Sequence, residues 1–245
     1  MKSFVLFSAL IVADTTKWGF GEQFIKTLTQ LPTKLRPEKV GNWERKTVRF
    51  ESVEACGNLW APSVKYKFEG QIFDSHLDFH WRRTSRLRTH GWIVHTGRRL
   101  DGSQILGSIR TYHTPARDID WYDVFLSYCR SCKPHLATVH LHAPGEERSD
   151  FPSESRDFKF GPFQWQLEER KLPQLPWCSY WDEKLAHQVG IDVATSTIEA
   201  NLSGSIVRIS PSIFDVIDDR QRFESRRTRA RTAFPRPYFL MPERP

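Results

Sequence analysis

The chain has 245 residues, of which 39% are hydrophobic and 13% aromatic. A chain of this length buries roughly 70% of its unfolded surface, so general disorder is excluded and one large domain or two small ones fit. The 36 Lys and Arg residues exceed the 29 Asp and Glu residues, and the net charge of +7 favours an acidic partner such as a nucleic acid, an acidic protein or an anionic membrane.

The amino-terminal residues predict a strand followed by an amphipathic helix. The apolar run from Phe4 to Ala13 is rich in β-branched and aromatic residues, which is typical of a buried strand. This run ends too early for a signal peptide and lacks the small-x-small cleavage pattern. Thr15 and Thr16 are placed to cap a helix whose apolar residues recur at helical spacing until Pro32.

The middle of the chain changes to strand-like alternation. A short strand is expected over Lys46–Phe50, and Ser52 is placed to cap a helix after it. Apolar and polar residues then alternate from Val64 to His113, which predicts an antiparallel meander. A second helix is expected to begin at Asp118, and a strand to follow over Leu136–Leu141.

Residues 143–157 predict a loop or linker, because they are rich in Pro, Ser and charge and almost free of apolar residues. They would separate a first half, 1–142, from a second half, 158–245. In the second half, Asp182 is placed to cap a helix, and a last helix is expected to begin at Ser210-Pro211. The whole pattern predicts an α+β fold, with helices packed on a mainly antiparallel sheet, and two ferredoxin-like halves would account for it.

The cysteines predict free thiols in a reducing compartment, the cytoplasm. Four cysteines are few for this length, and a disulfide framework belongs to shorter secreted domains. Cys129 and Cys132 have CxxC spacing, but no second pair exists and they end an amphipathic helix, so we interpret both as structural thiols. No stretch reaches the roughly 18 continuous apolar residues of a membrane span, so no membrane partner is expected.

No catalytic motif is present: GxSxG, GxxxxGK[ST], GxGxxG and HExxH are all absent, so no catalytic residue and no cofactor are assigned. His76, Asp78 and His80 alternate, as do His140 and His142, and on neighbouring strands they would converge around a metal or a phosphate. The alternative is that they lie on the solvent face of an antiparallel sheet. We expect the second arrangement and no metal, although the scattered acids of a nuclease would leave no sequence signature.

Arginine and tryptophan gather in one basic segment. Six arginines, two tryptophans and no acid lie between positions 81 and 99. We predict a partner-binding surface made of Trp81, Arg82, Arg83, Arg86, Arg88, Trp92, Arg98 and Arg99. Guanidinium groups bind phosphates and carboxylates equally well, so a nucleic acid and an acidic protein both fit. A second arginine cluster, over 220–231, predicts a solvated helix face.

The order of these elements resembles a known family. It is carried by the opening strand with Asp14-Thr15-Thr16, the Trp121-containing helix running into Ala137-Thr138-Val139-His140, and the closing Ile213-Phe214-Asp215-Val216 through Phe234-Pro235. In this layout the chain resembles bacterial immunity proteins of polymorphic toxin systems, of the immunity protein 52-like kind. The resemblance implies a non-enzymatic cytoplasmic protein that binds and blocks a cognate toxin, often a nuclease.

The net charge of +7 departs from the acidic surface expected of an inhibitor that mimics nucleic acid. The alternative function is a nucleic-acid-binding protein or a nuclease that uses the basic Arg/Trp segment.

Overall fold

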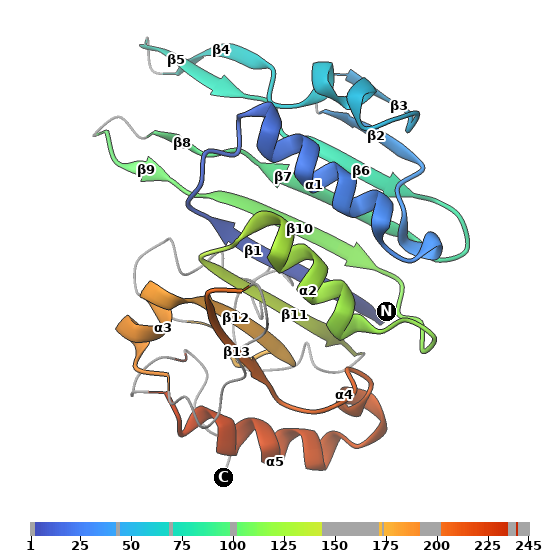
Figure 1. The fold of residues 1–245 in the computed structure, drawn as a ribbon, viewed down its shortest axis with the longest axis vertical. Helices are drawn as coiled ribbons and strands as arrows, with labels where there is room; N and C mark the ends of the chain where they lie inside the picture. The colour runs from blue at the N-terminus through green and yellow to red at the C-terminus, as the bar shows by residue number, and fades with distance from the viewer. Residues whose placement is uncertain are drawn as a thin grey trace. The chain divides into compact units, whose positions relative to one another are not determined.

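The computed structural model describes residues 3–42, 45–68, 71–98, 102–143, 172, 174–191, 202–234 and 239. The chain forms two compact units: residues 11–113, here called the inserted unit, and residues 1–10 with 114–245, here called the split unit. Both units combine helices with antiparallel strands (Figure 1), so the predicted α+β class is confirmed. The linker expected at 143–157 lies, beyond Ala143, outside the described residues and stays a prediction.

The sheet of the split unit has the order β13, β12, β11, β1. Its strands are β1 (Phe4–Ile11), β11 (Leu136–His142), β12 (Cys178–Asp182) and β13 (Gly204–Arg208), and each pair is antiparallel. These strands follow one another across the sheet in chain order. A ferredoxin-like split βαβ unit would instead place another strand between successive ones, so the observed order differs from the ferredoxin-like halves suggested by the sequence.

Helices pack on both faces of the split unit's sheet. On one face lies α2 (Trp121–Cys132), whose Tyr128 ring stacks on Phe7 at 4.5 Å between centroids. On the other lies α5 (Arg220–Arg231), whose Phe223 ring is 6.0 Å from that of His140. Strand β11 is therefore buried along its whole length.

Side-chain caps set the helix boundaries of the split unit. The Asp120 carboxylate accepts from two backbone N–H groups and starts α2 at residue 121, slightly later than expected. Asp182 caps α3 (Glu183–Val189), as predicted. The start expected at Ser210-Pro211 is wrong, because α4 (Asp215–Asp218) begins later and Asp219 then caps α5.

The main sheet of the inserted unit has the order β10, β7, β6, β2, β3, with every pair antiparallel. Its strands are β2 (Lys39–Asn42), β3 (Arg45–Arg49), β6 (Phe79–Arg83), β7 (Thr89–Val94) and β10 (Gly107–His113). Two hairpins accompany it: β4 (Ser63–Phe68) with β5 (Gln71–His76), and β8 (Gly97–Arg98) with β9 (Gln104–Ile105). The predicted antiparallel meander is confirmed.

One face of this sheet is covered by α1 (Trp18–Gln30), which appears in blue in Figure 1. Phe24 of α1 meets Trp81 of β6 edge to face at 5.3 Å. The predicted threonine cap is wrong: Lys17 precedes the helix without a side-chain cap bond, and Thr16 instead donates to Asp14. Short 3-10 helices, η1 (Thr33–Leu35) and η2 (Glu54–Leu59), complete the unit, and Ser52 receives the Ala55 N–H at the start of η2.

All four cysteines are free and buried. Burial raises the pKa of Cys56 to about 11 and that of Cys132 to about 12, and it raises the pKa of Cys129 well above its usual range. The thiolate is the reactive form of cysteine, so these thiols are chemically quiet in the folded chain.

We expect every thiol to resist a disulfide reagent such as dithionitrobenzoate at about pH 8 in the native protein, and all of them to react once guanidinium unfolds it, because unfolding restores both access and the ordinary pKa. The measurement is the number of thiols titrated with and without denaturant, in the absence of reductant. Rapid labelling of any thiol in the native protein would contradict the expectation.

Candidate functional site

The structure separates the two tryptophans of the predicted partner-binding surface. Trp81 is only 1% exposed and belongs to the core beneath α1, so its predicted role as a partner anchor is wrong. Trp92 points to the opposite face of the sheet and is half-buried. Arg82, Arg86, Arg88 and Arg98 are exposed, whereas Arg99 lies outside the described residues.

Strand register places the outward side chains of the inserted unit in two rows. The first row runs across five strands, because Arg49 pairs with Lys39, Lys39 with Arg82, Arg82 with His90, and His90 with Tyr112. The second row joins three strands by the same pairing. Together the rows form what we call the outer strip, made of Lys39, Arg49, His80, Arg82, His90, Trp92, Arg110 and Tyr112. It holds four Lys or Arg side chains and no carboxylate.

The aromatic rings of the outer strip stack on one another. His90 and Tyr112 lie 4.7 Å apart between centroids at an interplanar angle of 4°, and Trp92 is 5.7 Å from Tyr112 at 20°. Ring faces that stack in this way are used within the strip. Each of these rings therefore turns a face to a neighbouring ring of the strip.

A hairpin loop extends the strip beyond β6. The Glu38 carboxylate accepts hydrogen bonds from the backbone N–H groups and hydroxyls of Thr84 and Ser85, and it pairs with Arg83 at 3.2 Å. These hydrogen bonds, the Ser85 hydroxyl foremost, lower the pKa of Glu38 to about 2. The loop, which carries exposed Arg86 and Arg88, is therefore fixed by an ionised carboxylate. Arg83 pairs with Glu38 and is half-buried, whereas Arg82, Arg86 and Arg88 are exposed to solvent.

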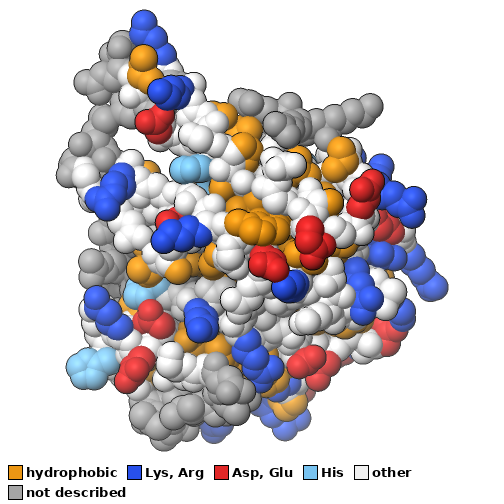
Figure 2. Space-filling model, turned by 45° about the horizontal axis from the view of Figure 1, so that its top comes forward, with side chains coloured by type: hydrophobic (Ala, Val, Ile, Leu, Met, Phe, Trp, Pro, Cys, Tyr) orange, Lys and Arg blue, Asp and Glu red, His pale blue; other side chains and the backbone are white. Residues whose placement is uncertain are grey.

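Figure 2 shows how charged side chains are distributed on one face of the molecule. On the face of the molecule drawn in Figure 2, Lys and Arg side chains are interspersed with Asp and Glu side chains and form no single patch. The outer strip differs from this face, because it holds four Lys or Arg side chains and no carboxylate.

The histidines do not lie as expected. His76 ends β5 while His80 lies on β6, so they do not alternate along one strand. His140 and His142 are 0% and 3% exposed, which overturns the expectation of a solvent-facing position for them. His140 accepts the Trp177 backbone N–H at 3.0 Å. In the part of the chain that the structure describes, no group of three or more His, Cys, Asp or Glu side chains could hold a metal ion.

His76 and Asp78 instead line a pocket of about 770 Å³ within the inserted unit. Three further residues with functional side chains join them there: Asp14, Asp74 and His95. These three are not among the site residues predicted from the sequence, because they come from separate segments and share no motif. Only the fold brings them together.

His95 is the most constrained residue of this pocket. It is 6% exposed, and its Nδ1 donates to the Thr15 carbonyl oxygen at 3.0 Å, since a carbonyl can only accept. Burial lowers the pKa of His95 to about 4, so the ring is neutral near pH 7. Its Nε2 is then an acceptor, and it is buried with no hydrogen-bond partner among the described residues.

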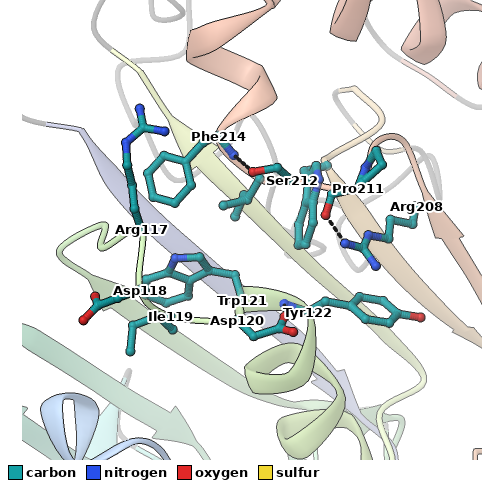
Figure 3. Close-up of a pocket in the computed structure, with 12 residues that line it drawn as sticks. Arg117, Asp118, Ile119, Asp120, Trp121, Tyr122, Arg208, Pro211, Ser212 and Phe214 are labelled. Atoms are coloured by element: carbon teal, nitrogen blue, oxygen red, sulfur yellow. Dashed lines mark hydrogen bonds between the residues drawn. The ribbon is translucent and has the colours of Figure 1, made fainter.

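A second cleft, of about 400 Å³, lies in the split unit between the residues before α2 and those after β13. Figure 3 shows Arg117 beside Phe214 at one end and the Arg208 guanidinium over the Tyr122 ring at the other, at 4.6 and 4.1 Å to the ring centroids. Arg117 also makes a two-pronged ion pair with Asp218, at 2.7 and 2.8 Å. Both arginines are therefore engaged within the unit, which makes this cleft a weaker candidate than the outer strip.

Comparison with known proteins finds similarity in fold but not in sequence. No protein-family model matches the chain, and no curated protein matches it. Among solved structures, the Pseudomonas aeruginosa T6SS protein PA0821 is similar, with a TM-score of 0.51 and 10% identity over 85% of this chain and 68% of that one. At this identity the likeness concerns the fold. In the described residues, no helix is both long and apolar enough to cross a membrane.

Proposed function

We propose that this protein is a non-enzymatic immunity protein that neutralises a cognate bacterial toxin by binding it through the outer strip and the adjoining arginine loop. The observation that carries the proposal is the composition of the strip: four cations and three stacked aromatic rings without a carboxylate. Arginine and large aromatic side chains dominate the binding energy of protein interfaces. The partner surface would be acidic.

The stacking of the rings favours a protein partner over a nucleic acid. A single strand of nucleic acid binds by placing its bases on open aromatic faces. In the outer strip the faces of His90 and Tyr112 are turned to each other, at 4.7 Å. The guanidinium groups of the strip bind carboxylates through paired hydrogen bonds.

Two further features support the proposal. The fixed conformation of the arginine loop, held by Glu38, reduces the ordering cost of binding. The similar fold of the Pseudomonas aeruginosa T6SS protein PA0821 is compatible with a secretion-related role and so supports the proposal.

The test is a charge reversal of three exposed arginines, Arg82→Glu with Arg86→Glu and Arg88→Glu. The candidate toxin is the product of a toxin-like gene next to the gene for this chain. We expect the variant to lose at least about 30-fold in affinity for that toxin, since a hot-spot residue is worth about 2 kcal/mol or more, and to lose protection in co-expression.

A matched control reverses three exposed arginines of α5: Arg220→Glu, Arg222→Glu and Arg229→Glu. It changes the net charge equally and should keep affinity within about threefold, because non-contact surface substitutions are nearly neutral. Unchanged toxin binding by the strip variant would overturn the proposal. If the unmodified protein instead binds labelled RNA or DNA with a steep salt dependence and gives no protection, the alternative function, nucleic-acid binding, replaces it.

A further inference from the structure

The pocket of the inserted unit is acidic, although the chain as a whole is basic. Its lining holds three carboxylates, those of Asp14, Asp74 and Asp78, against one guanidinium, that of Arg98. Three negative charges and one positive charge leave −2, with His95 neutral, whereas the chain carries +7. The lining of this pocket is therefore opposite in charge to the chain, which suggests a cationic ligand.

Several acceptors in this lining are not used by the described part of the protein. Asp74 is exposed and makes no hydrogen bond or ion pair there. The Gln104 amide donates to the Val12 carbonyl at 2.8 Å, which leaves its oxygen as an acceptor. His95 contributes a buried Nε2 without a partner among the described residues. Arg98, the one cation in the lining, donates to the Gly102 carbonyl at 3.5 Å.

These acceptors come from different segments that together line the pocket. Asp74 lies on β5, Gln104 on β9, and His95 directly follows β7. A metal ion does not fit, because no group of three ligands is close enough within the described residues. A flat cation with several N–H donors matches acceptors on several sides, and guanidinium has five such donors in one plane. The volume of about 770 Å³ is within the usual range for a ligand site.

We infer that this pocket binds a guanidinium group. The group has two sources, an arginine side chain of the partner protein or a free small guanidine, and only the first rests on the proposed function. With a partner arginine in the pocket and acidic partner groups on the outer strip, the protein would recognise a surface that carries both signs of charge. That requirement would make binding more selective than a basic strip alone.

The first experiment needs no toxin. The probe is L-argininamide, and L-citrullinamide, whose neutral urea replaces the guanidinium, is the matched control ligand. We expect argininamide to shift the ring NMR signals of His76 and His95 saturably and citrullinamide to leave them unchanged. Removal of charge by Asp74→Asn with Asp78→Asn should weaken argininamide binding at least about tenfold, because each charge-assisted hydrogen bond is worth about 1.5 kcal/mol or more.

The control variant, Asp118→Asn with Asp123→Asn, changes two exposed acids of the split unit and should bind argininamide normally. Asp74→Asn alone is a second variant. We expect it to fold normally, because the Asp74 side chain is exposed and has no described partner. Shifts that fail to saturate, that citrullinamide reproduces, or that Asp74→Asn and the double variant leave intact would overturn the inference.

The second experiment separates the two sources. If a partner arginine occupies the pocket, the Asp74/Asp78 variant also loses about tenfold in toxin affinity, and argininamide competes with the toxin. If argininamide binds while toxin affinity is unaffected, the pocket takes a free guanidine, and the guanidinium assignment stands. A failure of toxin binding altogether would remove the proposed function without changing the first result.

Discussion

Replacing Trp81 with alanine is expected to lower the free energy of unfolding by about 3 to 5 kcal/mol, the range for truncating a large buried aromatic side chain. The indole is 1% exposed and packs against Phe24 and Phe79 beneath α1. The ring is closely packed, since a Cβ added at Gly91 would clash with it. The measurement is urea unfolding followed by circular dichroism, with the slope against urea compared between variants.

Trp92→Ala is the matched control, because it removes the same side chain from the other face of the same sheet. The loss of its stacking on His90 and Tyr112 is expected to cost about 1 kcal/mol in stability. Toxin affinity should respond in the opposite order, with Trp92→Ala weakening it more than Trp81→Ala does at a temperature where both are folded. Equal losses of stability in the two variants would contradict the assignment of their faces.

The strand alternation is predictable from sequence, and it already separates Trp81 from the exposed arginines. Trp81 and Arg82 are consecutive on one strand and must therefore point to opposite faces. One surface therefore cannot hold both side chains. What the pattern could not tell is which face α1 covers, since that depends on packing between Phe24 and Trp81.

The misplaced histidines of β11 have a different cause. Apolar and polar residues alternate over Val139–His142, which is typical of a strand with one solvent-exposed face. The structure buries both faces, because α2 packs on one and Phe223 of α5 on the other. The backbone N–H of Trp177 then satisfies His140, and Phe4 stacks on His142 at 4.6 Å. The sequence pattern cannot distinguish a polar side chain that faces solvent from one that is buried against a partner distant in the chain.

The acidic pocket shows the limit of sequence reasoning most clearly. Asp14 and His95 are joined through the segment around Thr15 and Thr96, whose side chains and backbone exchange hydrogen bonds 81 residues apart in the chain. No spacing rule relates such positions. His76 and Asp78 were noticed for their alternation, yet they share the pocket because one ends β5 and the other lies in the turn that follows it.

Acidification is expected to destabilise the protein steeply between about pH 6.5 and pH 4. Burial lowers the pKa of His95 to about 4 and that of His113 to about 3, against an unfolded value near 6.5. Below about pH 6.5 the unfolded chain binds two protons that the folded chain does not. Stability is therefore complete above that pH and falls as the pH drops towards the folded pKa values, by about 3 kcal/mol for each histidine at about pH 4.

The measurement is the free energy of unfolding from urea titrations between about pH 7 and pH 5. Over this range the two histidines together should lower the stability by about 3.7 kcal/mol, and the slope should approach about 2.5 kcal/mol per pH unit near pH 5. The lowered pKa of Glu38 adds a loss of the same sign, but only at lower pH, towards about 2. His113→Gln and His95→Gln should each lower the stability at pH 7, because a hydrogen bond to Thr89 or Thr15 is disturbed, and should each remove about half of the slope. A histidine that became protonated without unfolding the chain would remove its own half of the slope, and that result would show that its site admits water and a charge. For His95 the same result would mean that Nε2 is open to solvent from the acidic pocket.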